Sequence, residues 1–329
     1  MQYAELQGLN IKVSRIAFGC MSTVPSQMYA GLVEDEAVQT MRLAFERGVN
    51  FFDTARAYGD GESERQLGAA VKGFRDEVVI ASKPKAGDLS RDEILSECEH
   101  SLRDLGTDRI DLYQIHWPKR QVSLEETVRA METLVEQGKV RQIGVCNFGP
   151  EDLNEWLDLG PCLTNQIAYS LLARGPEFGV QEVCELRGVG ILCYSPLAQG
   201  LLAGRYRTAD DVPDGKARTR HFRGERPEAR HGEPGCEQET FDAIEAIAAI
   251  AERIDRPMGD VALAWLLSRP AVTSVLAGAS RPDHVERNVR AAELQLSDED
   301  LAELDAATDP VKAAMGASID MWASPPRTR

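Results

Sequence analysis

Three ionisable side chains stand at or just after the ends of short apolar runs in the first third of the chain. Asp53 ends the run VNFFD, Lys83 directly follows VVIAS, and His116 ends IDLYQIH. Tyr58 follows Asp53 by five residues, in DTARAYGDG. A tyrosine has an ordinary pKa of about 10, and a nearby ammonium group favours the phenolate and lowers that pKa. We therefore expect Lys83 to tune the pKa of Tyr58.

The four side chains together suit the protonation of a carbonyl oxygen. Asp53 would keep the Lys83 ammonium charged and oriented, while His116 would hydrogen-bond a substrate oxygen or assist the proton transfer. The chemistry also needs a nucleophile for the carbonyl carbon. The sequence has no GxSxG elbow, no catalytic thiol dyad and no His and Cys cluster at metal-ligand spacing. We therefore expect a cofactor to supply the nucleophile, and we expect no metal.

These residues require a fold that brings successive strand ends to one rim. Short β-branched apolar runs alternate with amphipathic stretches, which is typical of βα units. Eight such runs predict strands over residues 16–20, 49–53, 78–82, 110–116, 142–146, 163–167, 190–194 and 273–277. Eight βα units predict an α/β fold of the closed (β/α)8 TIM-barrel type, with its chemistry at the C-terminal strand ends. A doubly wound sheet is the main competitor, but the first turn lacks GxGxxG.

Two segments exceed the eightfold plan, and capping patterns mark several helix starts. A long Pro-, Gly- and Arg-rich connection, residues 203–238, follows the seventh predicted strand. Residues 297–329 add a helix capped by Ser297 and a C-terminal tail. Capping boxes are expected at Ser63 with Gln66 and at Ser123 with Glu126. We predict that residues 1–329 form one barrel domain.

The composition of the chain excludes some classes of binding partner. The chain has 37 basic and 53 acidic residues, so its formal charge is −16 at pH 7. A field this negative repels phosphate backbones and anionic membrane surfaces, and no uninterrupted apolar run of about 18 residues is present. We expect no nucleic-acid or membrane partner and a cytoplasmic location. Scattered cysteines indicate reduced, mostly buried thiols: Cys20, Cys98, Cys146, Cys162, Cys184, Cys193 and Cys236.

The sequence resembles the aldo-keto reductase family along essentially its whole length. The matching segments are RIAFGCM, GVNFFDTARAYGDGESERQLG, VVIASK, DRIDLYQIHWP, GKVRQIGVCN, NQIAYS, ILCYSPLAQGLLAGRY and GASRPDHVERN. The resemblance implies a (β/α)8 barrel and reversible NAD(P)H-dependent reduction of a carbonyl to an alcohol. It also implies a catalytic tetrad, which falls on Asp53, Tyr58, Lys83 and His116.

The resemblance further implies where a nicotinamide would lie. Cys146, Asn147 and Gln166 would hold its carboxamide, and Tyr194 would stack on its ring. Cys146 stands where a typical family member has Ser, and a thiol donates a weaker hydrogen bond than a hydroxyl. Cys20, Met21 and Asp53 complete this part of the expected cofactor site.

The phosphates and the adenosine of the cofactor would lie along two later motifs. The pyrophosphate would pass Ser195, Pro196, Leu197, Gly200 and Arg205. The adenosine end would lie among Gly278, Ser280, Arg281, His284 and Asn288. Because Ser280 and Arg281 would face a 2′-phosphate, NADP(H) is favoured over NAD(H).

The substrate is expected to be a small carbonyl compound touching Tyr58, His116 and Trp117. Aldehydes, ketones, keto sugars and inositol-type polyols all remain open. Within the long connection, residues 216–230 have a net charge of +4. Our hypothesis is that this segment, including Arg218 and Arg220, folds over the cofactor phosphates and an anionic or polyhydroxylated substrate, near Trp322. His100, His221 and His231 match no motif and are expected at the surface.

Two other functions stay open at this point, and the oligomeric state is undetermined. A Schiff-base aldolase would use Lys83 as its nucleophile in the same barrel. A regulatory NAD(P)H-binding subunit related to the potassium-channel β subunits would share the cofactor motifs. NADPH binding without turnover of any carbonyl would favour that regulatory role.

Overall fold

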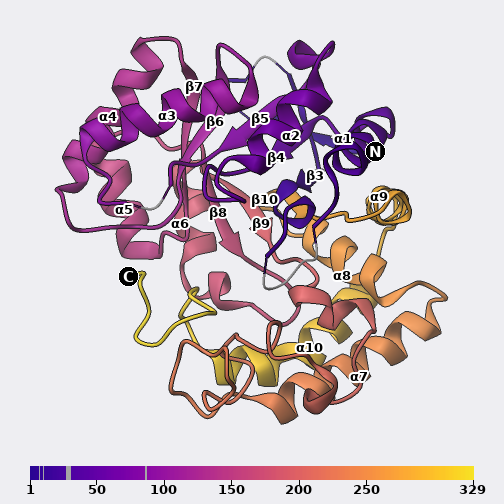
Figure 1. The fold of residues 1–329 in the computed structure, drawn as a ribbon. Coiled ribbons are helices and arrows are strands. Elements are labelled where there is room, and N and C mark those ends of the chain that lie inside the picture. The colour runs from indigo at the N-terminus through magenta and orange to yellow at the C-terminus, as the bar shows by residue number, and fades with distance from the viewer. Residues whose placement is uncertain (7, 10, 27–30, 86) are drawn as a thin grey trace.

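Eight parallel strands close into a barrel in the computed structural model, which describes residues 1–6, 8–9, 11–26, 31–85 and 87–329. The hydrogen-bonded order is β10-β3-β4-β5-β6-β7-β8-β9, and β10 pairs with both β3 and β9. The predicted barrel is therefore confirmed (Figure 1), with every strand boundary within two residues of the predicted run. The strands are β3 (Ile16–Gly19), β4 (Phe51–Asp53), β5 (Val79–Ser82), β6 (Ile110–Ile115), β7 (Val140–Cys146), β8 (Thr164–Ala168), β9 (Gly190–Tyr194) and β10 (Val272–Ala277).

Helices surround the barrel, as the βα alternation predicts. The surrounding helices are α1 (Glu34–Glu46), α2 (Glu62–Val71), α3 (Arg91–Leu105), α4 (Leu124–Glu136), α5 (Pro150–Leu159), α6 (Val180–Arg187), α8 (Met258–Leu267) and α9 (Pro282–Ala291). Two further helices, α7 (Glu237–Arg253) and α10 (Asp298–Met315), pack against each other below the barrel in the view of Figure 1. The helix α10 is the extra C-terminal helix that the sequence predicts.

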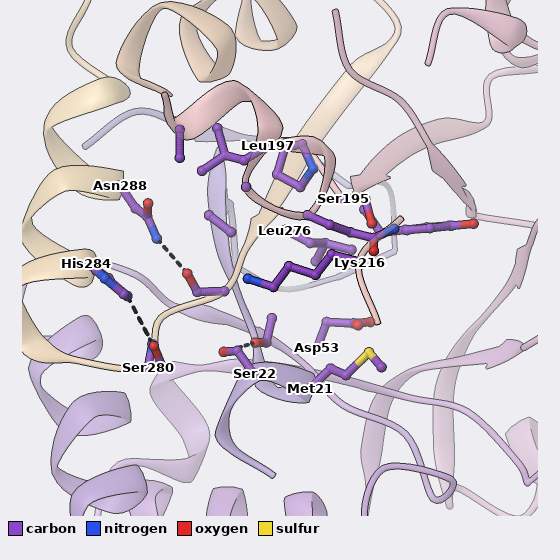
Figure 2. Close-up of a pocket in the computed structure, with 18 of the residues that line it drawn as sticks. Met21, Ser22, Asp53, Ser195, Leu197, Lys216, Leu276, Ser280, His284 and Asn288 are labelled. Carbon is purple, nitrogen blue, oxygen red and sulfur yellow. Dashed lines mark hydrogen bonds between the residues drawn. The ribbon is translucent and has the colours of Figure 1, made fainter. Parts of the chain in front are cut away.

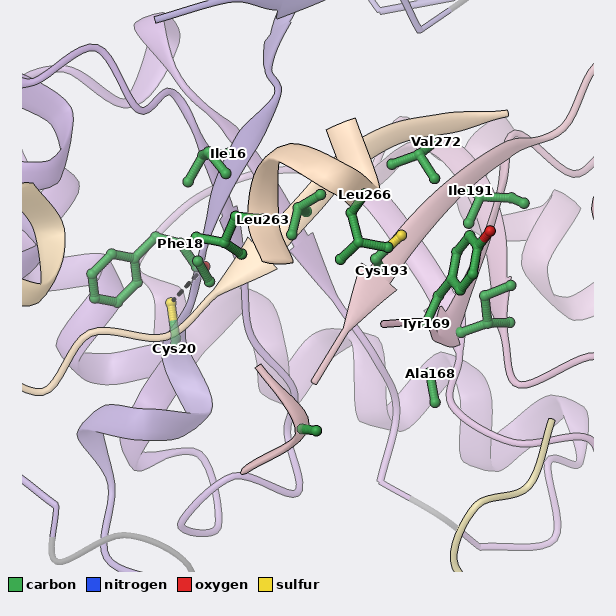
Figure 3. Close-up of a cluster of buried hydrophobic side chains, with 14 of the residues drawn as sticks. Ile16, Phe18, Cys20, Ala168, Tyr169, Ile191, Cys193, Leu263, Leu266 and Val272 are labelled. Carbon is green, nitrogen blue, oxygen red and sulfur yellow. Dashed lines mark hydrogen bonds between the residues drawn. The ribbon is translucent and has the colours of Figure 1, made fainter. Parts of the chain in front are cut away.

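Two hydrophobic layers hold the barrel together. Outward-facing strand residues pack under the helices, and Figure 3 shows part of this layer, where Cys193 lies beside Leu266 of α8 and Ile191 beside Tyr169. Inward-facing residues fill the barrel itself, among them Phe51, Val79 and Leu112. Because successive side chains of a strand alternate between its two faces, one strand can contribute to both layers, as β3, β4, β5, β6, β9 and β10 do.

The same alternation aims the expected site residues at the barrel axis. Phe51 faces inward, so Asp53, two positions later, does too, and Leu112 sets the same direction for His116. Lys83 shares its parity with the inward-facing Val79 and Ala81. Asp53 is thus the last inward position of β4, and Lys83 and His116 are the first inward positions after β5 and β6.

An antiparallel hairpin covers the opposite end of the barrel and was not predicted. Its strands are β1 (Tyr3–Ala4) and β2 (Val13–Ser14). Leu6 and Val13 join the cluster that fills the barrel. Two-residue strands are too short to show an alternating pattern, so no periodicity predicted them.

The long connection and the C-terminal tail lie against each other. The connection follows the short helix η4 (Ala198–Ala203), includes the short helix η5 (Ala209–Asp211) and leads into α7. The Arg220 backbone N–H donates to the Met321 carbonyl at 2.9 Å, and Arg230 forms a parallel bridge with Ala323. The tail ends at α5, where the Arg329 backbone N–H donates to Asp152 at 2.7 Å. Other short helices are η1 (Cys20–Thr23), η2 (Arg75–Glu77) and η3 (Gly175–Phe178).

Some local predictions are confirmed and others are wrong. Ser123 and Ser297 cap α4 and α10 as expected, and Asp300 completes a capping box with Ser297. Ser63 is not a cap, because α2 begins at Glu62 after Gly61, and the Ser63 hydroxyl instead contacts that of Thr54. Among the described residues no helix is long and apolar enough to cross a membrane.

The expected surface positions of two histidines are also wrong. His221 and His231 are both buried. The ring of His221 lies 2.7 Å from the Leu172 carbonyl and 2.9 Å from the Thr219 hydroxyl. Burial lowers the pKa of His221 to about 4. His221 therefore helps to pack the long connection, a role that composition alone did not indicate. All seven cysteines are free thiols, as expected.

Candidate active site

A cavity of about 870 Å³ opens at the C-terminal end of the barrel. Its floor and walls include Asp53, Tyr58 and His116 together with Gln166 and Tyr194. It continues past the loop after β9 to Ser280, His284 and Asn288 on the α9 side (Figure 2). The residues expected to carry chemistry and those expected to bind the far end of a cofactor thus line one continuous space.

Lys83 and Asp53 form a buried ion pair at this floor. The Lys83 Nζ donates to Asp53 Oδ1 at 2.7 Å, to Asp53 Oδ2 at 2.9 Å and to the Thr54 carbonyl at 2.8 Å. Burial opposes the charged form of Lys83, but the Asp53 carboxylate outweighs it, and the pKa of Lys83 is raised. Lys83 is fully buried and does not line the cavity. Asp53 therefore keeps it charged and oriented, as expected.

Tyr58 and His116 face each other above this pair. Their ring centroids are 5.9 Å apart with the planes at 79°, and the Lys83 ammonium lies 5.2 Å from the centre of the Tyr58 ring. Burial raises the pKa of Tyr58 to about 12, although the charge of Lys83 acts in the opposite direction. The Lys83 ammonium therefore lowers the pKa of Tyr58 as expected, but removal from water outweighs this effect and the net pKa is raised.

His116 is neutral at neutral pH. Burial first, and then the charges of Lys83 and Arg327, lower the pKa of its imidazole to about 3. The Asn147 side-chain amide donates to the His116 carbonyl at 3.0 Å, which fixes the backbone there. An uncharged imidazole can hydrogen-bond a substrate oxygen but holds no extra proton to give away at neutral pH. Of the two expected roles, the geometry and charge favour the hydrogen bond.

The amide residues of the expected nicotinamide end lie next to this group. The Gln166 side-chain amide donates to Asp53 Oδ2 at 2.7 Å, and Tyr194 donates its hydroxyl to Asn147 Oδ1 at 2.8 Å. Asn147, Gln166 and Tyr194 all line the cavity, as does Met21.

Two cysteines expected beside the nicotinamide do not reach the cavity. Cys20 is fully buried in the layer under the helices, and its Sγ lies 3.8 Å from the Phe18 carbonyl (Figure 3). Cys146 is also buried and does not line the cavity. The expectation of direct contact by Cys20 and Cys146 is therefore not met. Ser22, next to Met21, lines the cavity instead.

The C-terminal tail makes a hydrogen bond to Tyr194 that the sequence did not predict. Trp322 donates its indole N–H to the Tyr194 hydroxyl at 3.3 Å. Tyr194 in turn bonds Asn147, so a chain of hydrogen bonds runs from the tail to the backbone of His116. Trp322 was expected near the long connection, but nothing in its sequence context indicated this link.

The loop after β9 bends sharply along one wall of the cavity. Ser195, Ala198 and Gln199 have positive φ angles of 51°, 44° and 57°, and Gly200 has a φ of 101°. Such angles strain residues other than glycine, so the surrounding structure must hold the loop in this shape. Expected pyrophosphate contacts in this stretch all line the cavity, namely Ser195, Pro196, Leu197, Gly200 and Arg205.

The far end of the cavity carries polar and basic groups at the start of α9. Asn288 donates to the Gly278 carbonyl at 3.2 Å, and the Ser280 backbone N–H donates to His284 Nδ1 at 3.3 Å (Figure 2). Burial lowers the pKa of His284, although Asp283 opposes this effect. Arg281 and, unforeseen from the sequence, Arg287 also line this end, as does Gly278.

Comparison with known proteins identifies the family of this chain. The model described as the Aldo/keto reductase family matches residues 15–309. The chain belongs to the aldo/keto reductase family. The fold and the resemblance predicted from the sequence are thereby confirmed.

Relatives of this aldo-keto reductase span nearly its whole length. Aldo-keto reductase YhdN of Bacillus subtilis is 33% identical over 301 residues, covering 87% of each chain. The NADH-specific methylglyoxal reductase of Escherichia coli is 32% identical, covering 91% of this chain and 96% of its own. A crystal structure of an aldo-keto reductase from Klebsiella pneumoniae with NADPH has a TM-score of 0.73 and 30% identity, covering 93% and 95%. The chain is an oxidoreductase of carbonyl and alcohol groups that uses a nicotinamide cofactor.

The aldolase alternative does not fit this aldo-keto reductase. A Schiff-base lysine needs a neutral amine that reaches the substrate. Lys83 is buried, gives hydrogen bonds to Asp53 and Thr54, and has a raised pKa. No group of three or more His, Cys, Asp or Glu side chains among the described residues could hold a metal ion.

Some cations of the basic segment 216–230 line the cavity of the enzyme, and others bond to residues outside it. Lys216, Arg218 and Arg230 line the cavity. Arg220 does not, because it donates to Glu233 at 2.7 Å and to the Met315 carbonyl at 3.1 Å. The pairing of Arg218 with Arg220 as cavity residues is therefore wrong. Arg223 and Arg226 likewise bond Glu237 outside the cavity.

Proposed function

We propose that this chain reduces a small carbonyl compound with NADPH and that Tyr58 is the proton donor. The observation that carries the proposal is the Asp53–Lys83 ion pair directly beside Tyr58, with His116 opposite. These four residues would form the catalytic group. The cavity above them leads without interruption to the basic end at α9.

The residues along the cavity fit a dinucleotide. Amide groups of Asn147 and Gln166 lie at one end, and backbone and basic groups lie at the other, as a carboxamide and phosphates require. Tyr194 would present its ring to the nicotinamide. The bound cofactor would supply a hydride to the carbonyl carbon.

The chain's own contribution is to hold and deliver a proton. Because the pKa of Tyr58 is about 12, its hydroxyl is protonated at neutral pH. Tyr58 would give this proton to the carbonyl oxygen as the C=O bond becomes a C–OH bond, and the Lys83 ammonium would stabilise the phenolate that remains. Neutral His116 would hold the oxygen by a hydrogen bond. The same groups serve alcohol oxidation with the proton moving the other way.

The preference for NADP(H) over NAD(H) rests on charge at the α9 end. Arg205, Arg281 and Arg287 all lie close enough to His284 to lower its pKa, and all three line the cavity. A 2′-phosphate carries up to about two negative charges and would meet these cations beside the N-terminus of α9. In this structure Asp283 pairs with Arg281 and Arg287, so a phosphate would have to displace or share those pairs.

The test is a fluorescence titration with NADPH and NADH, followed by a panel of aldehydes and ketones in both directions of reaction. We expect tighter binding of NADPH and turnover of at least one carbonyl compound. Tight NADPH binding with no turnover would favour the regulatory-subunit alternative. Equal affinity for both cofactors would contradict the NADP(H) preference.

A further inference from the structure

We propose that the substrate of this enzyme carries an anionic group, a carboxylate or a phosphate, and that Arg327 and Arg218 bind it. The inference rests on the proposed function, because it names the substrate class of the same site. Its starting observation is a second group of cations in the cavity, at the end near His116 and Trp322 and away from α9.

The charge of the cavity differs from that of the whole protein. Among its described lining residues, seven are basic and two are acidic, although the chain carries −16 overall. Both acidic residues are paired with cations, Asp53 with Lys83 and Asp260 with Arg290. An anion is therefore attracted inside the cavity while the rest of the surface repels it.

The seven cations fall into two groups. Arg205, Arg281 and Arg287 gather around His284, and Lys216 lies beside Tyr206 near the loop after β9. These four suit the phosphates of the cofactor. The remaining three are Arg218, Arg230 and Arg327.

Arg327 is held in one orientation at the reacting end. Its guanidinium carbon lies 3.5 Å from the centroid of the Trp117 ring. Two of its nitrogens, Nε and Nη2, donate to the two oxygens of the fully buried Asp320 at 2.7 and 2.8 Å. Its third nitrogen, Nη1, has no hydrogen-bond partner among the described residues, so it can donate to a ligand. The charge of Arg327 lies close enough to His116 to lower its pKa.

Arg218 and Arg230 extend the positive charge from Arg327 across Trp322. The Arg218 guanidinium lies 5.5 Å from the Trp322 ring, and Trp322 bonds Tyr194. Arg230 lies close enough to Arg218 to affect its pKa, and the bridge between Arg230 and Ala323 ties it to the tail. The two arginines therefore face the same part of the cavity as the expected substrate contact Trp117.

Two carboxylates stand behind these arginines without lining the cavity. Asp320 pairs with Arg327, and Glu228 lies near Arg218. Counting both, the group keeps a net charge of +1. Asp320 is fully buried and fixes the Arg327 guanidinium for charge-assisted hydrogen bonds with a carboxylate or phosphate, whereas Glu228 is half-buried. The geometry thus matches a carbonyl compound with its C=O at Tyr58 and its anionic end toward Arg327.

The test compares matched aldehydes with the purified enzyme and saturating NADPH. Succinic semialdehyde and butanal differ by a carboxylate, and glyceraldehyde 3-phosphate and glyceraldehyde differ by a phosphate. We expect the wild-type kcat/KM to be about tenfold or more higher for at least one anionic member of a pair, mainly through KM. The pair that shows the larger ratio identifies the anion as carboxylate or phosphate.

Variants assign the preference to the two arginines. Arg327→Met keeps an apolar stem against Trp117 and should lower the anionic-to-neutral ratio about tenfold, while Arg327→Lys should restore part of it. Arg218→Met should also lower the anionic-to-neutral ratio, and it leaves the ion pair between Arg327 and Asp320 intact. It therefore remains informative if the Arg327→Met variant does not fold. Arg223→Met is the matched control, because Arg223 belongs to the same segment but lies outside the cavity. The NADPH Kd should stay within about twofold in every variant.

Three results would overturn the inference. One is a wild-type enzyme that reduces butanal and glyceraldehyde as well as their anionic partners. Another is an equal loss of kcat/KM for anionic and neutral aldehydes in Arg327→Met and Arg218→Met. The last is a large rise in the NADPH Kd of these variants, which would assign the arginines to the cofactor. If no aldehyde were reduced, the proposed function would fail, and calorimetry of succinic semialdehyde and glyceraldehyde 3-phosphate on the NADPH-loaded protein would still decide the anion site.

Discussion

The Lys83 ammonium lies 5.2 Å from the centre of the Tyr58 ring and is fixed there by both oxygens of Asp53. This placement puts a permanent positive charge beside a phenol that is otherwise removed from water. The charge does not ionise Tyr58 at rest, because burial dominates and raises the pKa of Tyr58 to about 12. The Lys83 charge is expected to act when Tyr58 gives up its proton, because it then stabilises the phenolate that remains.

Replacing Tyr58 by Phe should remove the proton donor while leaving the cavity nearly unchanged. We expect kcat to fall by at least about 100-fold and the NADPH Kd to stay within about twofold. Steady-state kinetics and a fluorescence titration measure the two. Tyr3→Phe, at an exposed tyrosine far from the cavity, is the control. A Tyr58→Phe enzyme with near wild-type kcat would contradict the assignment.

Replacing Lys83 by Met should cost both activity and stability. The change leaves the buried Asp53 carboxylate without its cation, and breaking a buried pair in this way typically costs about 3–5 kcal/mol. We expect chemical denaturation to show that loss.

The double variant Asp53→Asn with Lys83→Met separates the two effects. It removes the unpaired charge, so the free energy of unfolding should recover in part while kcat stays low. Recovery of activity in the double variant would show that Lys83 matters only for stability.

Arg281→Met should weaken NADPH but not NADH. Arg281 lines the cavity next to Ser280 at the start of α9, where a 2′-phosphate is expected. We expect the NADPH Kd to rise about tenfold and the NADH Kd to change by less than about twofold. Arg47→Met is the control, because Arg47 pairs with Glu286 of the same helix and neither residue lines the cavity. Equal losses for both cofactors would place Arg281 away from the 2′-phosphate.

Glu177→Gln should reveal a pH-dependent part of the stability. Glu177 accepts hydrogen bonds from Arg174, Lys312 and Tyr169, and although burial opposes its ionised form, the Arg174 and Lys312 cations lower its pKa to about 2. A carboxyl group whose pKa is lower in the folded than in the unfolded chain stabilises the fold above pH 4.5 and loses that contribution as the pH falls toward 2. We expect the variant to lose roughly 2–3 kcal/mol at pH 7.

Urea denaturation at pH 7 and at pH 3 measures this difference. The gap between wild type and Glu177→Gln should narrow at the lower pH. Glu182→Gln, at an exposed glutamate nearby, should change the free energy of unfolding by less than about 0.5 kcal/mol. A gap that is the same at both pH values would contradict the coupling between Glu177 and its cations.

Local patterns determined the barrel and its family. Strand periodicity and turn signals are short-range properties, so eight runs were enough to predict β3 to β10, and the position of each residue in its strand predicts that Asp53, Lys83 and His116 point inward. Motifs such as DTARAYG added Tyr58, and the geometry brings it beside the other three.

Tertiary structure decided what depends on distant partners. Arg218 and Arg220 are neighbours in sequence and both basic, yet Arg218 lines the cavity and Arg220 binds Glu233 and the end of α10. The net pKa of Tyr58 depends on how completely the folded chain removes its hydroxyl from water. The spacing of charged residues along the sequence does not reveal that burial. Arg327 reaches Trp117 only because the tail runs from α10 back to α5 (Figure 1), and no local sequence pattern indicates that path.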